Sequence, residues 1–142
     1  AGARARLAEQ HTDVRIVEGV VDADLDVYAP CALGATLTDD SVSRLRATVV
    51  CGAANNQLAT VEVADELRRR GVLWVPDFIA NAGGLIQVGG ELTGATRDVV
   101  LADTARIATT VTDLLRLAAE QDSTTSTAAR TLVEQRLAAA RA

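Results

Sequence analysis

The first part of this chain contains three successive short apolar runs, Leu25-Asp-Val-Tyr-Ala29, Ala47-Thr-Val-Val-Cys51 and Val72-Leu-Trp-Val75. Each run contains β-branched or aromatic residues and is followed by Gly or Pro, a pattern typical of a strand. The run centres lie about 20 to 25 residues apart, which leaves room for the dozen or more residues of a parallel crossover. The runs therefore predict a three-stranded parallel sheet and an α/β fold.

Helical patterns precede and separate these runs. Residues 1–10 resemble the end of a helix, and residues 38–46 predict a short helix with Thr38 as its N-cap. Thr60 is the predicted N-cap of a further helix, and Gly71, after a basic last turn, is its predicted left-handed stop. The alternation of strand and helix is that of a parallel α/β sheet.

The C-terminal third predicts two helices. A Ser/Thr-rich break at 123–127 separates them. We therefore expect one domain, 1–142, with an α/β portion, 1–96, and a helical tail, 97–142. A fourth apolar run at 14–17 predicts one more strand. The apolar face of the first tail helix comprises Val100, Ile107, Val111, Leu114 and Ala118.

Charge and composition exclude several classes of partner. The net charge is −5, and the chain has 14 basic residues, all of them Arg. An acidic chain with one Trp, one Tyr and one Phe lacks the basic field and the stacking surfaces of nucleic-acid binding. No run approaches the ~18 apolar residues of a membrane span, so we expect no membrane partner and a cytoplasmic location. Cys31 and Cys51, outside any Cys/His cluster, predict two buried free thiols and no metal site.

The loops that follow the three strands are the candidate site, because ligands of open parallel sheets bind beyond the carboxyl ends of the strands. All three loops are rich in small residues, and two of them carry the amides Asn55, Asn56 and Asn81. Carboxamides donate and accept hydrogen bonds at once, which suits a neutral, amide-bearing ring better than a metal. Asparagine is also a common turn and cap residue, and residue spacing alone leaves both interpretations open.

Three stretches carry a resemblance to a known family: Asp26-Val-Tyr-Ala-Pro-Cys-Ala-Leu-Gly34, Gly52-Ala-Ala-Asn-Asn-Gln-Leu58 and Pro76-Asp-Phe-Ile-Ala-Asn-Ala-Gly-Gly84. Together with the helical tail, they resemble the glutamate/leucine/phenylalanine/valine dehydrogenase family. The resemblance is to the C-terminal, NAD-binding domain of its leucine, valine and phenylalanine members. It implies a partial Rossmann-type, doubly wound parallel sheet that lacks its first strands and carries a C-terminal pair of helices. It also implies NAD-dependent oxidative deamination of a branched-chain or aromatic L-amino acid to its 2-oxo acid.

The resemblance assigns roles to individual residues. The adenosine half of NAD borders the first loop, Asn55 and its neighbour Asn56 lie near the nicotinamide and its ribose, and Asn81 faces the ring and the reacting carbon. Glutamate-specific relatives have a hydroxyl at the position of Val88, so the apolar side chain here favours an apolar substrate. The predicted cofactor-binding residues are Pro30, Cys31, Ala32, Asn55, Asn56 and Asn81, and the predicted substrate-binding residues are Leu85 and Val88, which share a face of a helix beginning near Gly83.

Parts that the family needs are absent from this sequence. It contains no Gly-rich phosphate turn and no Lys, whereas the family's catalytic lysine belongs to a separate substrate domain. We therefore assign no catalytic residue, treat Asp26, Asp77 and His11 as loop and surface residues, and expect a missing N-terminal substrate domain as partner. The chain is then the C-terminal part of an enzyme that forms homo-oligomers. The alternatives are a truncated, non-catalytic binding or oligomerisation module and, less favoured, a hydroxy-acid dehydrogenase.

The missing strands also affect the predicted sheet. In the strand order of a dinucleotide-binding domain, the run at 14–17 and the run at 25–29 are separated by two strands that this chain lacks. We therefore expect only the last three strands to form the parallel core. The run at 14–17 is then displaced, disordered or newly paired, and the exposed sheet edge favours association.

Overall fold

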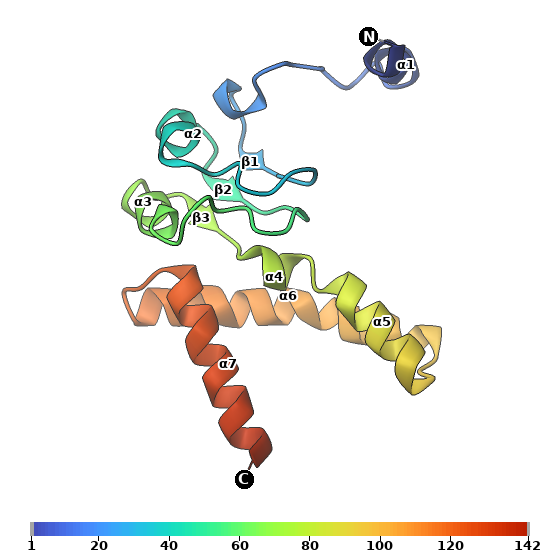
Figure 1. Cartoon of the computed structure of the whole chain (residues 1–142), viewed down its shortest axis with the longest axis vertical. Coiled ribbons are helices and arrows are strands. Elements are labelled where there is room, and N and C mark those ends of the chain that lie inside the picture. The colour runs from blue at the N-terminus through green and yellow to red at the C-terminus, as the bar shows by residue number, and fades with distance from the viewer. Residues whose placement is uncertain (1, 142) are drawn as a thin grey trace.

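A computed structural model of the chain describes residues 2–141, so residues 1 and 142 of the predicted domain lie outside it. Its sheet contains β1 (Val27–Tyr28), β2 (Val49–Val50) and β3 (Leu73–Trp74) in the order β1-β2-β3, with both pairs parallel (Figure 1). The predicted α/β fold class and three-stranded parallel core are confirmed. The strands are shorter than the apolar runs because only two residues of each form ladder pairs.

Helices α2 (Asp39–Arg44) and α3 (Val63–Arg69) lie beside the sheet and pack on each other (Figure 1). The predicted N-cap of α2 is confirmed, because the Thr38 hydroxyl accepts the backbone N–H of Ser41 at 3.0 Å. The core between sheet and helices is made of fully buried aliphatic and aromatic side chains, whose burial is the main favourable contribution to folding. It includes Tyr28, Leu37, Val42, Leu45, Val50, Val63, Leu67 and Trp74.

The start of α3 differs from the prediction. The helix begins at Val63, and Thr60 caps no helical N–H; its hydroxyl hydrogen-bonds the Glu62 carboxylate and lowers the pKa of that group. The predicted stop is confirmed, because Gly71 has a φ of 71° and the Val72 N–H donates to the Leu67 carbonyl at 2.9 Å. Glycine adopts this left-handed conformation without the steric cost of a Cβ.

Residues 2–10, at the start of the described chain, lie apart from the sheet (Figure 1). Helix α1 (Gly2–Gln10) is exposed throughout, and a short 3-10 helix, η1 (Val20–Asp22), precedes β1 (Figure 1). The prediction of a strand at 14–17 is wrong, since these residues form no strand. A β-strand needs a hydrogen-bonding neighbour, and the described residues supply none here. The expectation that this run leaves the three-stranded core is confirmed.

Four helices follow β3: α4 (Asp77–Ala80), α5 (Gly83–Thr93), α6 (Arg97–Glu120) and α7 (Thr125–Arg141). The short helix α4 lies in a stretch that the sequence predicts as loop, whereas the start of α5 near Gly83 is confirmed. Within residues 2–141, no helix is both long and apolar enough to span a bilayer.

Helices α6 and α7 form the C-terminal pair that the fold class predicts. They pack through a second core of Leu114, Ala118, Ala128 and Ala129. The break between them is shorter than predicted, because α7 already begins at Thr125. The Thr125 hydroxyl donates to the Trp74 carbonyl at 2.7 Å and so connects α7 to the end of β3.

Candidate functional site

The loops that follow β1 and β2 lie side by side at the carboxyl end of the sheet, and β3 leads there into α4 (Figure 1). Their backbones touch at two glycines. A Cβ on Gly52 would lie 2.6 Å from the Pro30 nitrogen and nearer still to the Pro30 carbonyl oxygen. A Cβ on Gly34 would lie 2.6 Å from the Asn55 carbonyl oxygen. Only glycine fits at these distances, so the two loops form one joined unit.

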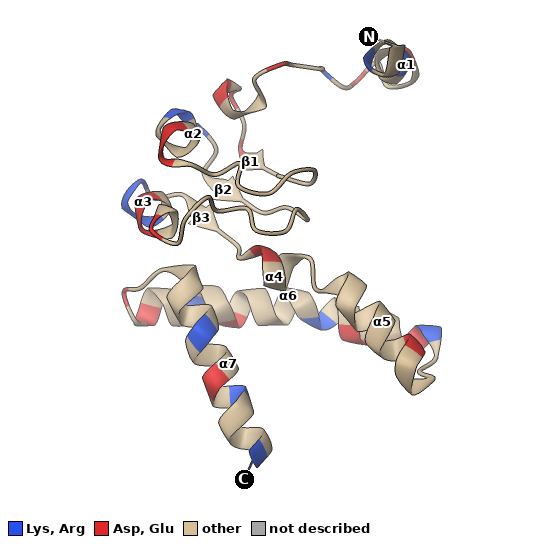
Figure 2. Cartoon of the chain, viewed as in Figure 1, with Lys and Arg blue, Asp and Glu red and all other residues tan. Residues whose placement is uncertain are grey.

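A cleft of about 840 Å³ lies between the loop after β2, helix α4 and the first turn of α5, with α6 behind it. Residues 29–38, after β1, and residues 51–61, after β2, carry no charged side chain (Figure 2). Four of the predicted site residues, Asn55, Asn56, Asn81 and Leu85, line this one cleft. The structure therefore brings together amides that are 26 residues apart in the sequence.

Asn55 and Asn81 face each other across the cleft. The Asn81 Nδ2 donates to Asn55 Oδ1 at 2.6 Å and to the Ala53 carbonyl at 3.4 Å. Among the residues that the structure describes, Asn81 Oδ1 and Asn55 Nδ2 make no hydrogen bond. The pair thus leaves one acceptor and one donor for a ligand, and a carboxamide is the group that offers the matching donor and acceptor.

Asp77 belongs to this site, contrary to its treatment as a loop residue. Its Oδ2 accepts the backbone N–H of Asn56 at 2.8 Å, so helix α4 holds the loop after β2. Asn56 has a φ of 53°, a left-handed conformation that Asn tolerates better than most residues. The sequence offered one signal for this role of Asp77. The Pro-Asp pair after a predicted strand places a carboxylate at the first turn of a helix.

Removing this carboxylate is expected to loosen the loop. Asp77→Ala should lower the free energy of unfolding of the natural full-length protein by about 1 kcal/mol, the net value of one hydrogen bond. Asp77→Asn keeps an acceptor oxygen and should lose less. Urea unfolding of the three proteins measures the difference, and equal midpoints for all three would show that the contact contributes nothing.

Pro30, Cys31 and Ala32 line a different cavity, of about 470 Å³, at the end of β1. Cys31 is exposed and Cys51 is only partly buried, so the prediction of two buried thiols is wrong, while both cysteines are free as predicted. The Cys31 Sγ accepts the Ala53 N–H at 3.5 Å, which connects this cavity to the loop that carries Asn55. The two predicted halves of the cofactor site therefore lie on neighbouring loops.

The predicted substrate residues are separated. Both lie on α5 and are exposed, Leu85 by 78% and Val88 by 51%. Leu85 lines the cleft of Asn55 and Asn81, whereas Val88 lies outside its lining. The described residues therefore complete no pocket around both side chains.

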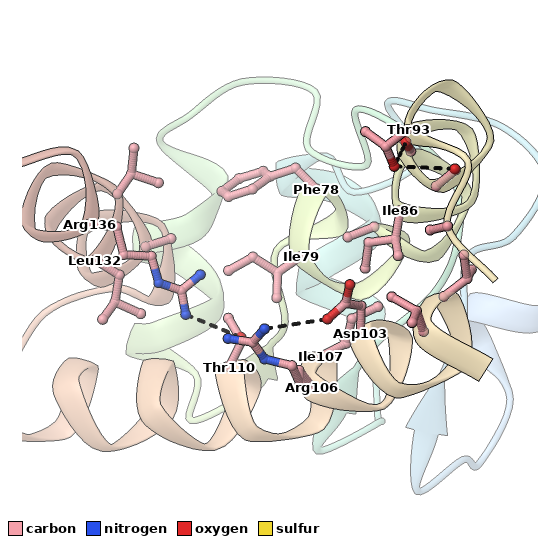
Figure 3. A pocket seen from close by; sticks show the side chains of 18 residues that line it. Phe78, Ile79, Ile86, Thr93, Asp103, Arg106, Ile107, Thr110, Leu132 and Arg136 are labelled. Atoms are coloured by element: carbon pink, nitrogen blue, oxygen red, sulfur yellow. Dashed lines mark hydrogen bonds and ion pairs between the residues drawn. The ribbon is translucent and has the colours of Figure 1, made fainter. Parts of the chain in front are cut away.

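A second groove, of about 680 Å³, lies among α4, α5, α6 and α7 and is mostly apolar (Figure 3). Its polar side chains are engaged with one another: Arg136 donates to Thr110 at 3.3 Å, and Arg106 pairs with Asp103 at 3.4 Å (Figure 3). The groove therefore lacks the converging unpaired amides of the cleft. In the described part of the chain, no group of three His, Cys, Asp or Glu side chains could hold a metal ion.

Comparison with known proteins agrees with this architecture. The glutamate/leucine/phenylalanine/valine dehydrogenase family profile matches residues 3–141. The chain is 46% identical to valine dehydrogenase of Streptomyces albus, with 96% of this chain and 38% of that protein aligned. It is 40% identical to phenylalanine dehydrogenase of Bacillus thermotolerans, with 89% of this chain and 34% of that protein aligned. The chain thus spans little more than a third of these relatives.

Among solved structures, L-tryptophan dehydrogenase from Nostoc punctiforme matches with a TM-score of 0.92 at 34% identity. The match covers 97% of this chain and 43% of that protein. A family match over nearly the whole chain and a structural match of this quality lead to one conclusion. The chain belongs to the glutamate/leucine/phenylalanine/valine dehydrogenase family.

Proposed function

We propose that this chain is the cofactor-binding part of an NAD-dependent amino-acid dehydrogenase that oxidatively deaminates a branched-chain or aromatic L-amino acid to its 2-oxo acid. The observation that carries the proposal is the facing pair of Asn55 and Asn81. Their side chains are hydrogen-bonded at 2.6 Å, and within the described part of the chain they leave one donor and one acceptor without a partner. Family membership supports the reaction class. In this proposal, residues 1–96 bind the cofactor and the tail, 97–142, supports them.

The residues of the cleft fit the nicotinamide end of NAD. Asn55 Nδ2 would donate to the ring's carboxamide or ribose, Asn81 Oδ1 would accept from the carboxamide, and Asn56 would lie beside them. When bound, NAD supplies the acceptor for the hydride. The two asparagines contribute by fixing the ring's orientation, since hydride transfer requires the ring face at contact distance from the reacting carbon.

The loop after β1 fits the adenosine half of the cofactor. The backbone of Pro30, Cys31 and Ala32 borders a separate cavity of about 470 Å³ next to the amide cleft. The cavity is bounded mainly by apolar and small residues, as a flat heterocycle requires.

The apolar side chains on α5 support a hydrophobic substrate. Leu85 and Val88 offer no hydrogen bond to a side-chain carboxylate, which would be desolvated without a partner at a cost of several kcal/mol. A branched or aromatic side chain has no such cost. We propose that the substrate domain covers these exposed residues and completes the pocket.

The chemical step needs groups that this chain does not have. Its basic residues are all Arg, so a lysine that polarises the substrate must come from an N-terminal substrate domain of the whole protein. We propose that this protein is a cytoplasmic homo-oligomer. An unpaired edge of β1, where Val27 is 51% exposed, supports association and also favours the second candidate function, a non-catalytic oligomerisation module.

An NADH titration separates the two functions. We expect the whole protein to bind NADH and to reduce NAD with valine, leucine or phenylalanine as substrate. We expect weak or no binding by residues 1–142 alone, because the Gly-rich phosphate turn is absent from them. A whole protein that assembles but neither binds NADH nor oxidises any of these amino acids would establish the oligomerisation module instead.

A further inference from the structure

Among residues 2–141, Gln57 is the one fully buried polar side chain next to the amide cleft, with 0% of its surface exposed. It follows directly after Asn55 and Asn56, in the loop between β2 and α3. A buried carboxamide is costly unless each of its polar atoms is hydrogen-bonded. Its partners therefore show what it holds in place.

The Gln57 carboxamide is fully bonded, and its three partners belong to three parts of the site. Its Nε2 donates to the Gly52 carbonyl at 2.7 Å, where the loop begins, and to the Ala54 carbonyl at 3.0 Å, in the middle of the loop. Its Oε1 accepts the indole N–H of Trp74, on β3, at 3.1 Å. The loop is thus wrapped around the Gln57 amide and attached through it to the neighbouring strand.

Asn55 lies between the residues that these bonds fix. Gln57 holds the backbone from the inside at Ala54, and Asp77 holds it from the cleft side through the Asn56 N–H at 2.8 Å. Among the residues described, the Asn55 side chain is hydrogen-bonded only to Asn81. The position of its amide therefore follows from the path of the backbone.

We propose that Gln57 is a positioning residue, which sets the location of the Asn55 amide relative to Asn81 without touching the cofactor. This inference rests on the proposed function for its catalytic consequence. Its structural part is that one carboxamide fixes the loop from within. This part rests only on the hydrogen bonds of Gln57 within the chain. Gln57 would act on hydride transfer only through the loop.

The chemistry of the three bonds requires an amide. An ionised glutamate in this place has the same shape but no donor, so its oxygens would face two carbonyl oxygens. Leucine fills the space with no polar atom and leaves both carbonyls and the indole N–H unsatisfied. Gln57→Glu is therefore the sharpest test. Trp74→Phe is a milder one, since among the three bonds of Gln57 it removes only the bond to Oε1.

Hydrogen exchange in the whole protein without cofactor tests the structural part. In Gln57→Glu we expect the Asn56 N–H to exchange about tenfold faster than in the wild type, while amides of the α6–α7 pair keep their rates. Val42→Ala is the matched control, because Val42 is fully buried in the same core but touches no part of the loop hydrogen bonding. An unchanged Asn56 rate in Gln57→Glu, or an equal increase in Val42→Ala, would overturn the inference.

Kinetics test the catalytic part. In Gln57→Glu and, less strongly, in Trp74→Phe, kcat should fall by up to about tenfold with KM for NAD little changed, because the adenosine half binds elsewhere. The deuterium isotope effect on kcat, measured with the 2-deuterated amino acid, should rise as hydride transfer becomes rate-limiting. The control Val42→Ala should lower only the fraction of folded, active enzyme. That loss leaves the isotope effect unchanged, because the remaining enzyme has the wild-type site.

The two parts fail in distinguishable ways. A wild-type protein that reduces no NAD contradicts the proposed function, while the exchange experiment still decides whether Gln57 fixes the loop. An active wild type with an unchanged isotope effect in both variants would show that Gln57 has no positioning role in catalysis.

Discussion

Replacing Gly52 by alanine is expected to abolish measurable NADH binding by the whole protein and to lower its free energy of unfolding by about 1–3 kcal/mol, the range for overpacked sites. The new Cβ would lie 2.6 Å from the Pro30 nitrogen and 2.8 Å from its carbonyl carbon. These are backbone atoms, so no side-chain rotation relieves the contact. The loops after β1 and β2 must separate, and with them the two proposed halves of the cofactor site.

NADH fluorescence titration and urea unfolding measure both effects. Gly89→Ala is the matched control, since a Cβ at Gly89, in helix α5, would meet no atom within 4 Å. That variant should bind NADH normally and gain about 0.5–1 kcal/mol from the better helix propensity of alanine. Normal NADH affinity in Gly52→Ala would contradict the joined-loop site.

Asn81→Asp is expected to lower kcat/KM roughly a hundredfold, which corresponds to about 2.8 kcal/mol of lost interaction. The carboxylate has no donor for Asn55 Oδ1 or for the Ala53 carbonyl, which the Asn81 amide now satisfies at 2.6 and 3.4 Å. If the Asn55 amide turns its Nδ2 toward the new carboxylate, the cleft loses the donor that it offers to the ligand. In either arrangement the cleft no longer offers the matched donor and acceptor that a carboxamide needs.

Steady-state kinetics with NAD and the preferred amino acid measure this loss. Gln135→Glu, an equivalent amide-to-carboxylate change on the exposed side of α7, is the control and should retain wild-type kinetics. An Asn81→Asp protein with more than a third of the wild-type kcat/KM would rule out a direct role for the Asn55–Asn81 pair.

The sheet was predictable because its signal is local. Three apolar runs at crossover spacing specify parallel pairing, and the pairs Val27–Val49 and Val49–Leu73 confirm it. The run at 14–17 is also rich in β-branched residues but forms no strand, because strand formation depends on a neighbour that the described residues do not supply here. Helix α4 was missed for a related reason, since four residues between Pro76 and Asn81 are too few for a helical periodicity.

The candidate site was predictable only in part. That Asn55 and Asn81 meet follows from the strand order, because adjacent parallel strands place their loops at the same edge. The roles of Asp77 and Gln57 do not follow from it. Each bonds to backbone atoms of a loop, at Asn56 and at Gly52 and Ala54, and strand order alone does not give the path of that loop.

Helix α5 also shows the limit of inference from spacing. Leu85 and Val88 share one helical face, as their i, i+3 spacing predicts, yet only Leu85 lines the cleft. Which of two neighbours on a helix face reaches a cavity depends on the tilt of that helix, and the tilt of α5 is set by its packing on α6.

The most direct measurement is a crystal structure of the whole protein with NAD bound. We predict the nicotinamide carboxamide within hydrogen-bonding distance of both Asn55 Nδ2 and Asn81 Oδ1, and the adenosine against Pro30, Cys31 and Ala32. NAD bound in the groove of α5, α6 and α7, or a nicotinamide ring out of reach of both asparagines, would contradict the cofactor site proposed for this chain.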